Sequence, residues 1–187
     1  VTSERNHATL RSDIDVAVLF GDGRFKQGES RWLFDEEVFP VCSPQWLKEQ
    51  VAPLTVQTLQ DCPLLDLRQE NNSQWFDWNG VFRELGITAA PTPGQLRFDN
   101  YTLLIQAAIA GQGVAIGWRH LVDNLLEQNW LCRPISSTVI SRLGYYVVQP
   151  QRKRRGQLVD RFVEWLVAEQ ANSAHSLTGL ALPSIAV

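Results

Sequence analysis

Apolar positions along this chain follow two different periods, and the two alternate from one segment to the next. Short apolar runs bounded by turn residues predict buried strands, and a loosely alternating segment predicts a longer extended one. The predicted strands cover residues 13–20, 31–41, 63–67, 95–98, 113–117 and 143–148. Helical spacing predicts helices over residues 75–85, 99–110 and 119–127, a short one through Trp46 and Leu47, and a last one after residues 152–155. Strands that alternate with helices favour an α/β fold.

Residues that start and stop helices lie at the ends of these segments. Ser43-Pro44 has the form of an N-cap followed by proline at the first helical position. Ser73 and Asp99 are expected to cap the two helices that follow. Gly86 and Gly111 are expected to end those same two helices.

The last predicted helix carries large apolar side chains on one face. Leu158, Phe162, Trp165 and Leu166 stand at i, i+4, i+7 and i+8. We therefore expect Phe162 and Trp165 to be core or interface residues.

Composition and charge narrow the class of protein. Of the 187 residues, 44% are hydrophobic and 20% charged, as in a soluble globular protein. No apolar run approaches the roughly 20 residues that a membrane span needs. A net charge of −3 argues against a nucleic-acid-binding surface on this chain. For the basic run 152–155, a solvated loop is favoured over a phosphate contact.

Cysteine and histidine usage argues against a metal centre. The three cysteines, Cys42, Cys62 and Cys132, are widely spaced and form no CxxC pair, and the three histidines lie far apart. Three buried free thiols in a reducing compartment are the favoured interpretation. No GxSxG, HExxH or P-loop motif occurs, so no catalytic residue, metal or cofactor is predicted. A Ser–His arrangement has no positive support from the sequence, although spacing alone leaves it open.

Three features could bind a small ligand, and each has a plain structural alternative. Asp99-Asn100-Tyr101 opens a helix after a strand and could hold an anion, or could be an ordinary N-cap. The loop Gly21-Asp22-Gly23 could approach a ligand, or could be a tight turn. Trp75, Trp78 and Trp118 could enclose a quaternary amine, but ordinary aromatic packing is favoured.

Three stretches, in this order, resemble the effector-binding domain of LysR-type transcriptional regulators. The first is Asp13 to Gly23, similar to a strand and glycine loop of that family. The second, Phe39 to Leu47, contains Val41-Cys42-Ser43-Pro44. The third runs from Phe98 to Trp118 and contains Gly111-Gln112-Gly113-Val114. The resemblance spans about residues 1–170 and is strongest to the glycine-cleavage-activator-like branch.

The resemblance implies a two-lobed α/β fold of the type 2 periplasmic-binding-protein kind. Lobe I would comprise residues 1–36 and 136–187, and lobe II residues 37–135. Lobe I would lack its first strand and helix, and the N-terminal helix-turn-helix of the family would be absent from this chain. The lack of any methionine also favours a fragment of a longer protein.

The function implied is that of the effector-sensing domain of a bacterial regulator, without enzymatic activity. A small anionic or zwitterionic metabolite would bind in the cleft between the lobes. The expected ligand-binding residues are Thr2, Phe20, Gly21, Asn100, Tyr101 and Trp118. A cytoplasmic homodimer or homotetramer would bind DNA through the missing domain, with no membrane partner. The alternative is a periplasmic solute-binding protein of the same fold, with an enzyme as a distant third.

Overall fold

The computed structural model describes residues 14–26, 28–68, 74–87, 96–151 and 156–177, with side chains as far as residue 170. Its strands are β1 (Ala17–Gly21), β2 (Gly28–Val41), β3 (Leu65–Leu67), β4 (Leu96–Phe98), β5 (Ala115–Trp118) and β6 (Val139–Pro150). Its helices are α1 (Pro44–Lys48), α2 (Trp78–Glu84), α3 (Tyr101–Ile109), α4 (Asp123–Glu127) and α5 (Gln157–Leu177), with a 3-10 turn, η1 (Thr58–Asp61). Each predicted strand and helix has a counterpart, and the predicted α/β class is confirmed.

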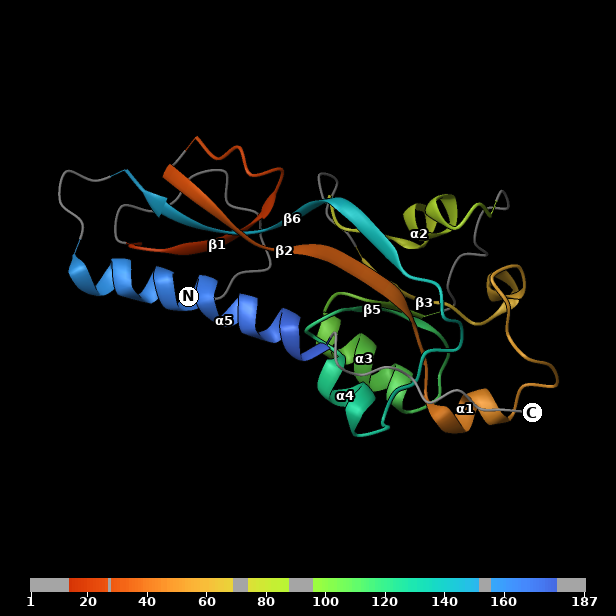
Figure 1. Ribbon diagram of the computed structural model, residues 1–187. Coiled ribbons are helices and arrows are strands. Elements are labelled where there is room, and N and C mark those ends of the chain that lie inside the picture. The colour runs from red at the N-terminus through yellow and green to blue at the C-terminus, as the bar shows by residue number, and fades with distance from the viewer. Residues whose placement is uncertain (1–13, 27, 69–73, 88–95, 152–155, 178–187) are drawn as a thin grey trace. The chain divides into compact units, whose positions relative to one another are not determined.

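The six strands form two sheets. The larger has the strand order β1-β6-β2-β5, and β3 and β4 form a parallel pair in the smaller one. Strand β1 runs antiparallel to β6, with Ala17 opposite Val148, and β5 runs antiparallel to β2, with Trp118 opposite Val38. The chain passes from β4 through α3 to β5, as Figure 1 shows.

The chain divides into two compact units. The first contains residues 1–35 and 142–187, and the second contains residues 36–141. Strands β2 and β6 each begin in one unit and end in the other.

In the second unit, successive residues of β2 face two separate apolar clusters. Val38 packs with Ile116 and Trp118 of β5, whereas Phe39 packs in the other cluster with Ala115 and with α3. This alternation follows from the period of two along a strand. The strands β2 and β5 therefore form a wall that is buried on both sides.

The N-cap of α3 is Asn100, so the prediction that Asp99 caps this helix is wrong. The Oδ1 atom of Asn100 accepts a hydrogen bond from the Leu103 backbone N–H at 3.2 Å. Asp99 instead pairs with Arg68 at 3.0 Å, and both side chains are largely exposed. A capping oxygen accepts from the backbone N–H two or three residues further on, and here that amide belongs to Leu103, which is three residues after Asn100 and four after Asp99.

The helix α2 also begins later than expected. Its N-cap is Asp77, whose Oδ1 accepts from the Gly80 N–H at 2.7 Å. The predicted cap, Ser73, lies outside the described residues.

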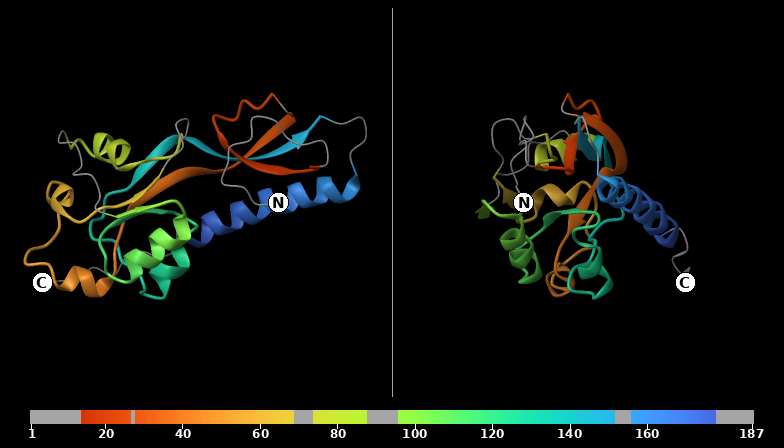
Figure 2. Two further views of the ribbon diagram at one scale, coloured as in Figure 1. Left: turned by 180° about the vertical axis from the view of Figure 1, so that it is seen from behind. Right: turned by 90° about the vertical axis from the view of Figure 1, so that its left-hand side faces the viewer.

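Phe162 and Trp165 were expected in the core or at an interface; the core role is wrong for the first unit, and the interface role stays a prediction. Both side chains are about half exposed (47% and 55%), and their rings stack on each other at 5.9 Å. Among the described side chains of α5, Val163 is buried and packs against Leu33 and Val147. Helix α5 lies along the sheet of this unit, as Figures 1 and 2 show.

The side of α5 that is buried leads to a testable prediction about the free energy of unfolding. Val163→Ala should lower the free energy of unfolding by about 2 kcal/mol, because it opens a cavity beside Leu33 and Val147. Phe162→Ala should cost less than about 1 kcal/mol, since much of that ring already contacts solvent. Urea unfolding of both variants checks the ranking, and a larger loss for Phe162→Ala would contradict the observed phase.

Candidate functional site

A shallow pocket lies within the second unit, at the carboxyl end of β3. It is small, and the space between its walls comes to about 220 Å³ only when open solvent is included. Its walls come from β3, the start of α2, the first turn of α3 and β5. The lining residues are Leu65, Asp66, Leu67, Phe76, Asp77, Leu104, Ile116 and Trp118. In open α/β sheets, ligands bind at the carboxyl ends of strands, so this is the position where a binding site is expected.

Of the predicted site residues, Trp118 lines this pocket, and Tyr101 contacts Trp118 from the start of α3. The Tyr101 ring meets the Trp118 ring edge-on at 5.2 Å. The Tyr101 hydroxyl accepts a hydrogen bond from the Trp118 N–H at 3.2 Å and donates to the Ile116 carbonyl at 3.4 Å. Asn100 precedes Tyr101 and caps the same helix. The start of α3 is therefore tied to β5 through Tyr101.

The other predicted site residues belong to the first unit. Phe20 is buried, with its ring 5.1 Å from that of Tyr145. Gly21 pairs with Gly144 of β6, and a Cβ at Gly21 would stand 3.1 Å from the Phe25 ring. Thr2 lies outside the described residues.

The tryptophans named as a candidate amine cage mostly serve packing. Trp78 is buried against Phe82, and its indole N–H donates to the Leu65 carbonyl at 2.9 Å. The Trp118 indole N–H donates to Glu36 at 2.9 Å. With both indole donors engaged inside the unit, the structure favours packing over a cage.

Two carboxylates line the pocket and influence each other. Asp77 caps α2, and Asp66 pairs with Arg97 at 3.2 Å. Burial raises the pKa of Asp66, Arg97 opposes that rise and the charge of Asp77 adds to it. This side of the pocket is therefore acidic.

Glu36 is a buried polar residue that the sequence patterns did not single out. Only 1% of it is exposed, and its Oε1 accepts hydrogen bonds from the Trp118 indole at 2.9 Å and the Phe76 N–H at 3.2 Å. Burial raises the pKa of Glu36, while hydrogen bonds with Trp118, Phe76 and Ser141 oppose the rise. Phe76 and Trp118 both line the pocket, so Glu36 holds two of its walls in place. No local signal marks this role, because the partners are distant in sequence.

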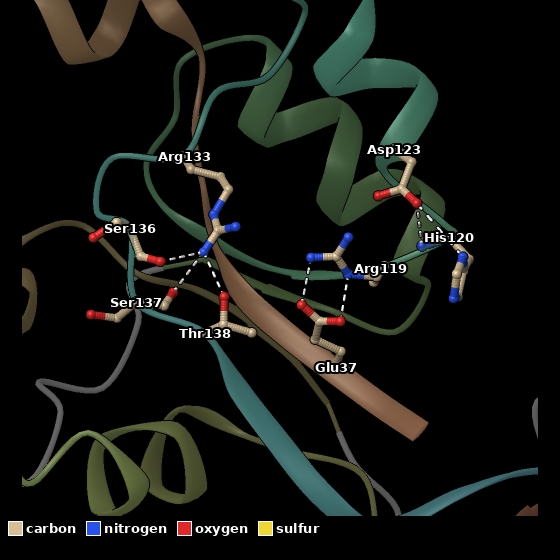
Figure 3. A network of polar contacts seen from close by, with 8 residues as sticks. All are labelled: Glu37, Arg119, His120, Asp123, Arg133, Ser136, Ser137 and Thr138. Atoms are coloured by element: carbon tan, nitrogen blue, oxygen red, sulfur yellow. Dashed lines mark hydrogen bonds and ion pairs between the residues drawn. The ribbon is translucent and has the colours of Figure 1, made fainter. Parts of the chain in front are cut away.

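A second polar network, drawn in Figure 3, braces β2 and the segments after β5. Both oxygens of Glu37 contact the Arg119 guanidinium, at 2.5 Å each. Arg133 donates to the carbonyls of Ser136 and Ser137 and to the Thr138 hydroxyl.

Both arginines of this network also pack against one aromatic ring. Arg133 and Arg119 lie over Phe39, at 4.3 and 5.7 Å from the ring centroid. Burial lowers the pKa of Arg133, and the charge of Arg119 lowers it further. Glu37 neutralises Arg119, and Arg133 hydrogen-bonds to the turn at residues 136–138. The network therefore stabilises the fold of the second unit.

Neither a candidate metal cluster nor a candidate membrane span occurs among the described residues. No group of three or more His, Cys, Asp or Glu side chains suited to a metal ion occurs in the part of the chain that the structure describes. Among the same residues, no helix is long and apolar enough to cross a bilayer.

The chain thus folds into two α/β units that share the strands β2 and β6. The chain matches the family model described as "LysR substrate binding domain" over residues 1–171, and it belongs to that family. The family resemblance stated from the motifs is thereby confirmed.

Curated relatives are named as transcriptional regulators. The HTH-type transcriptional regulator DsdC of Escherichia coli K12 is 30% identical over 168 residues, which is 89% of this chain and 54% of that protein. The glycine cleavage system transcriptional activator of the same strain is 27% identical, over 90% of this chain and 53% of that protein. The chain thus spans about half the length of these relatives. Their names describe regulators and not enzymes, in agreement with the prediction of a non-enzymatic chain.

Solved structures confirm the fold. The effector domain of the regulator AmpR of Pseudomonas aeruginosa matches with a TM-score of 0.69 at 23% identity, covering 88% of this chain and 76% of that one. Full-length AphB, a Vibrio cholerae virulence activator, matches with a TM-score of 0.68 at 16% identity, covering 91% of this chain and 57% of that one.

Proposed function

We propose that this chain is the effector-sensing part of a LysR-type transcriptional regulator. The family match over residues 1–171 carries the proposal, and the regulator names of the relatives support it. In the whole protein, a further domain would bind DNA, and binding of an effector would shift the balance between two states of the domain. Such a regulator would act in the bacterial cytoplasm, where its DNA is. The two units would serve as lobe I and lobe II.

The effector would be a small zwitterionic metabolite of the α-amino acid class. The N-terminus of α3 offers backbone N–H groups and the positive end of a helix dipole to a carboxylate. Leu104, in the first turn of α3, lines the same pocket as Asp66 and Asp77. A protonated amine beside these two carboxylates would relieve their repulsion, which favours a zwitterion over a simple anion.

The residues proposed to bind the effector are the same six that were expected from the sequence. Asn100, Tyr101 and Trp118 would contribute from the second unit, and Thr2, Phe20 and Gly21 from the first. The whole protein would be a homodimer or homotetramer, and sedimentation showing only monomers of the full-length protein at high micromolar concentration would overturn this part.

The ligand site is tested by Asn100→Asp in the full-length protein. Aspartate keeps the side-chain oxygen that caps α3, so the helix should stay intact. Its added negative charge should weaken the binding of an anionic group at the helix terminus at least about tenfold. Calorimetry with a panel of α-amino acids, followed by footprinting on DNA upstream of the gene, measures binding and response.

Matched controls separate the charge effect from a general disturbance. Asp99→Asn changes the neighbouring residue in the opposite sense and breaks only an exposed ion pair, so it should bind the effector at least as tightly as the unsubstituted protein. Amino acid amides and N-acetyl derivatives, which lack one of the two charges, should not bind. Equal binding by the Asn100→Asp variant would show that the effector carboxylate lies elsewhere.

A further inference from the structure

Two cysteines that are 90 residues apart in sequence lie side by side in the second unit. The Sγ atoms of Cys42 and Cys132 are 3.9 Å apart. Their backbones exchange two hydrogen bonds, Cys42 N–H to the Cys132 carbonyl at 3.0 Å and Cys132 N–H to the Cys42 carbonyl at 2.8 Å. The two residues thus form an isolated antiparallel bridge.

This backbone register holds the residues within reach of a disulfide. Residues that exchange both hydrogen bonds have Cα atoms about 5.5 Å apart. Disulfide-linked cysteines have Cα separations of about 4.4–6.8 Å. The backbone therefore needs no large movement, and closure requires only that the two side chains turn so that the sulfur atoms approach to about 2.05 Å.

We propose that Cys42 and Cys132 are a modification site, a thiol pair that a hydroperoxide converts into a reversible disulfide. Cys132 is partly exposed and Cys42 is fully buried, so the oxidant meets Cys132 first. The Cys132 thiolate attacks the peroxide O–O bond, which yields a sulfenic acid and, for hydrogen peroxide, one water. The Cys42 sulfur then attacks the Cys132 sulfur, and its proton leaves with the hydroxyl group as a second water.

The surroundings of the pair determine the rate of this reaction. Burial raises the pKa of both thiols, so the reactive thiolate is scarce near neutral pH. Oxidation should be slow at pH 7 and should accelerate by about tenfold per pH unit as the thiolate fraction grows. A disulfide formed in this way is reversible, because a dithiol reductant exchanges with it.

The disulfide would join two segments that are already in contact. Cys42 follows the end of β2, and Cys132 directly precedes Arg133, whose guanidinium packs over Phe39 of the same strand. Oxidation would fasten this contact covalently. Cys62 is the natural competitor and control, since it packs against the same apolar cluster and its thiol donates to the Thr58 carbonyl at 3.6 Å.

The test oxidises the reduced chain with hydrogen peroxide at pH 7 and pH 8.5. Remaining thiols are then alkylated in denaturant, and non-reducing peptide mapping identifies any cross-link. We expect a mass loss of two hydrogens, one cross-link between the Cys42 and Cys132 peptides, faster formation at the higher pH, and full reversal by dithiothreitol. Cys62→Ser should behave as the unsubstituted chain, whereas Cys132→Ser should form no link.

The cross-link map of the unsubstituted chain decides the outcome even if a cysteine variant folds poorly. Links that involve Cys62, or conversion of Cys132 to sulfinic or sulfonic acid without a link, would overturn the proposal. So would full retention of all thiols under conditions that oxidise the denatured chain. None of these readouts depends on an effector or on DNA, so they stand apart from the proposed function.

Discussion

Gly113→Ala is expected to lower the free energy of unfolding by about 3–5 kcal/mol. Gly113 has φ +152°, a conformation that alanine rarely adopts, and a Cβ there would stand 2.2 Å from the Pro63 carbonyl oxygen. That oxygen cannot easily withdraw, because it accepts the Val114 N–H at 2.9 Å. The next bond, from Leu65 N–H to the Val114 carbonyl at 2.8 Å, ties the same segment to β3. The methyl group would therefore push apart the strands that form one wall of the pocket.

Gly111→Ala is the matched control, two residues away in the same motif. Gly111 also has a positive φ of +76°, but its Cβ would meet only the Trp46 Cβ at 3.7 Å, an ordinary contact. Its expected cost is about 1 kcal/mol, from the backbone conformation alone. Urea unfolding of the two variants separates backbone strain from steric overlap. Equal losses would contradict the close approach of Gly113 to Pro63.

Glu36→Ala is the second substitution expected to have a large effect. It removes the acceptor shared by the Trp118 indole and the Phe76 N–H. Leaving two buried donors without a partner should cost about 3 kcal/mol. Glu36→Gln keeps an acceptor oxygen in place and should retain most of the stability. Thermal unfolding of both variants near pH 5 provides the comparison, and equal losses would show that the shared acceptor is unimportant.

We also expect the stability difference between Glu36→Gln and the unsubstituted chain to depend on pH. Burial raises the pKa of Glu36, so the folded chain holds this proton more tightly than the unfolded chain does. The stability that the protonated group contributes is present at low pH and is lost as the pH rises through the raised folded pKa. Glutamine does not titrate, so the stability of Glu36→Gln relative to the unsubstituted chain should increase from pH 4.5 to pH 7.5. Each unit of pKa elevation corresponds to about 1.4 kcal/mol. A constant difference across this range would contradict a raised pKa of Glu36.

Local patterns in the sequence were sufficient for the fold class and the family. Turn residues and apolar runs located each described strand and α-helix, but they gave no sign of the 3-10 turn η1 or of the extension of α5 to Leu177. Gly111-Gln112-Gly113 was among the motifs that indicated the family, and the positive φ at both glycines explains why this segment needs them. These features are encoded by short stretches of chain, so a single sequence can reveal them.

The phase of α5 shows where local patterns failed. The predicted stripe joined Leu166, which packs against the buried cluster, to Leu158, Phe162 and Trp165, which are exposed. Val163, which lies outside that stripe, is the residue that packs against Leu33 and Val147. Which stripe is buried depends on the shape of the surface opposite, and that surface is built from distant parts of the chain.

The sequence by itself thus determined the order of the elements, the α/β class and the membership of the family, because strand and helix periods, caps and glycine turns act over a few residues. Tertiary structure alone decided that Glu36 joins Phe76 to Trp118 and that Cys42 meets Cys132. These partners are separated by 40, 82 and 90 positions. No local period relates such residues. Their proximity follows from the pairing of β2 with β5 and from the return of the chain after α4, and both arise only when the second unit closes around its core.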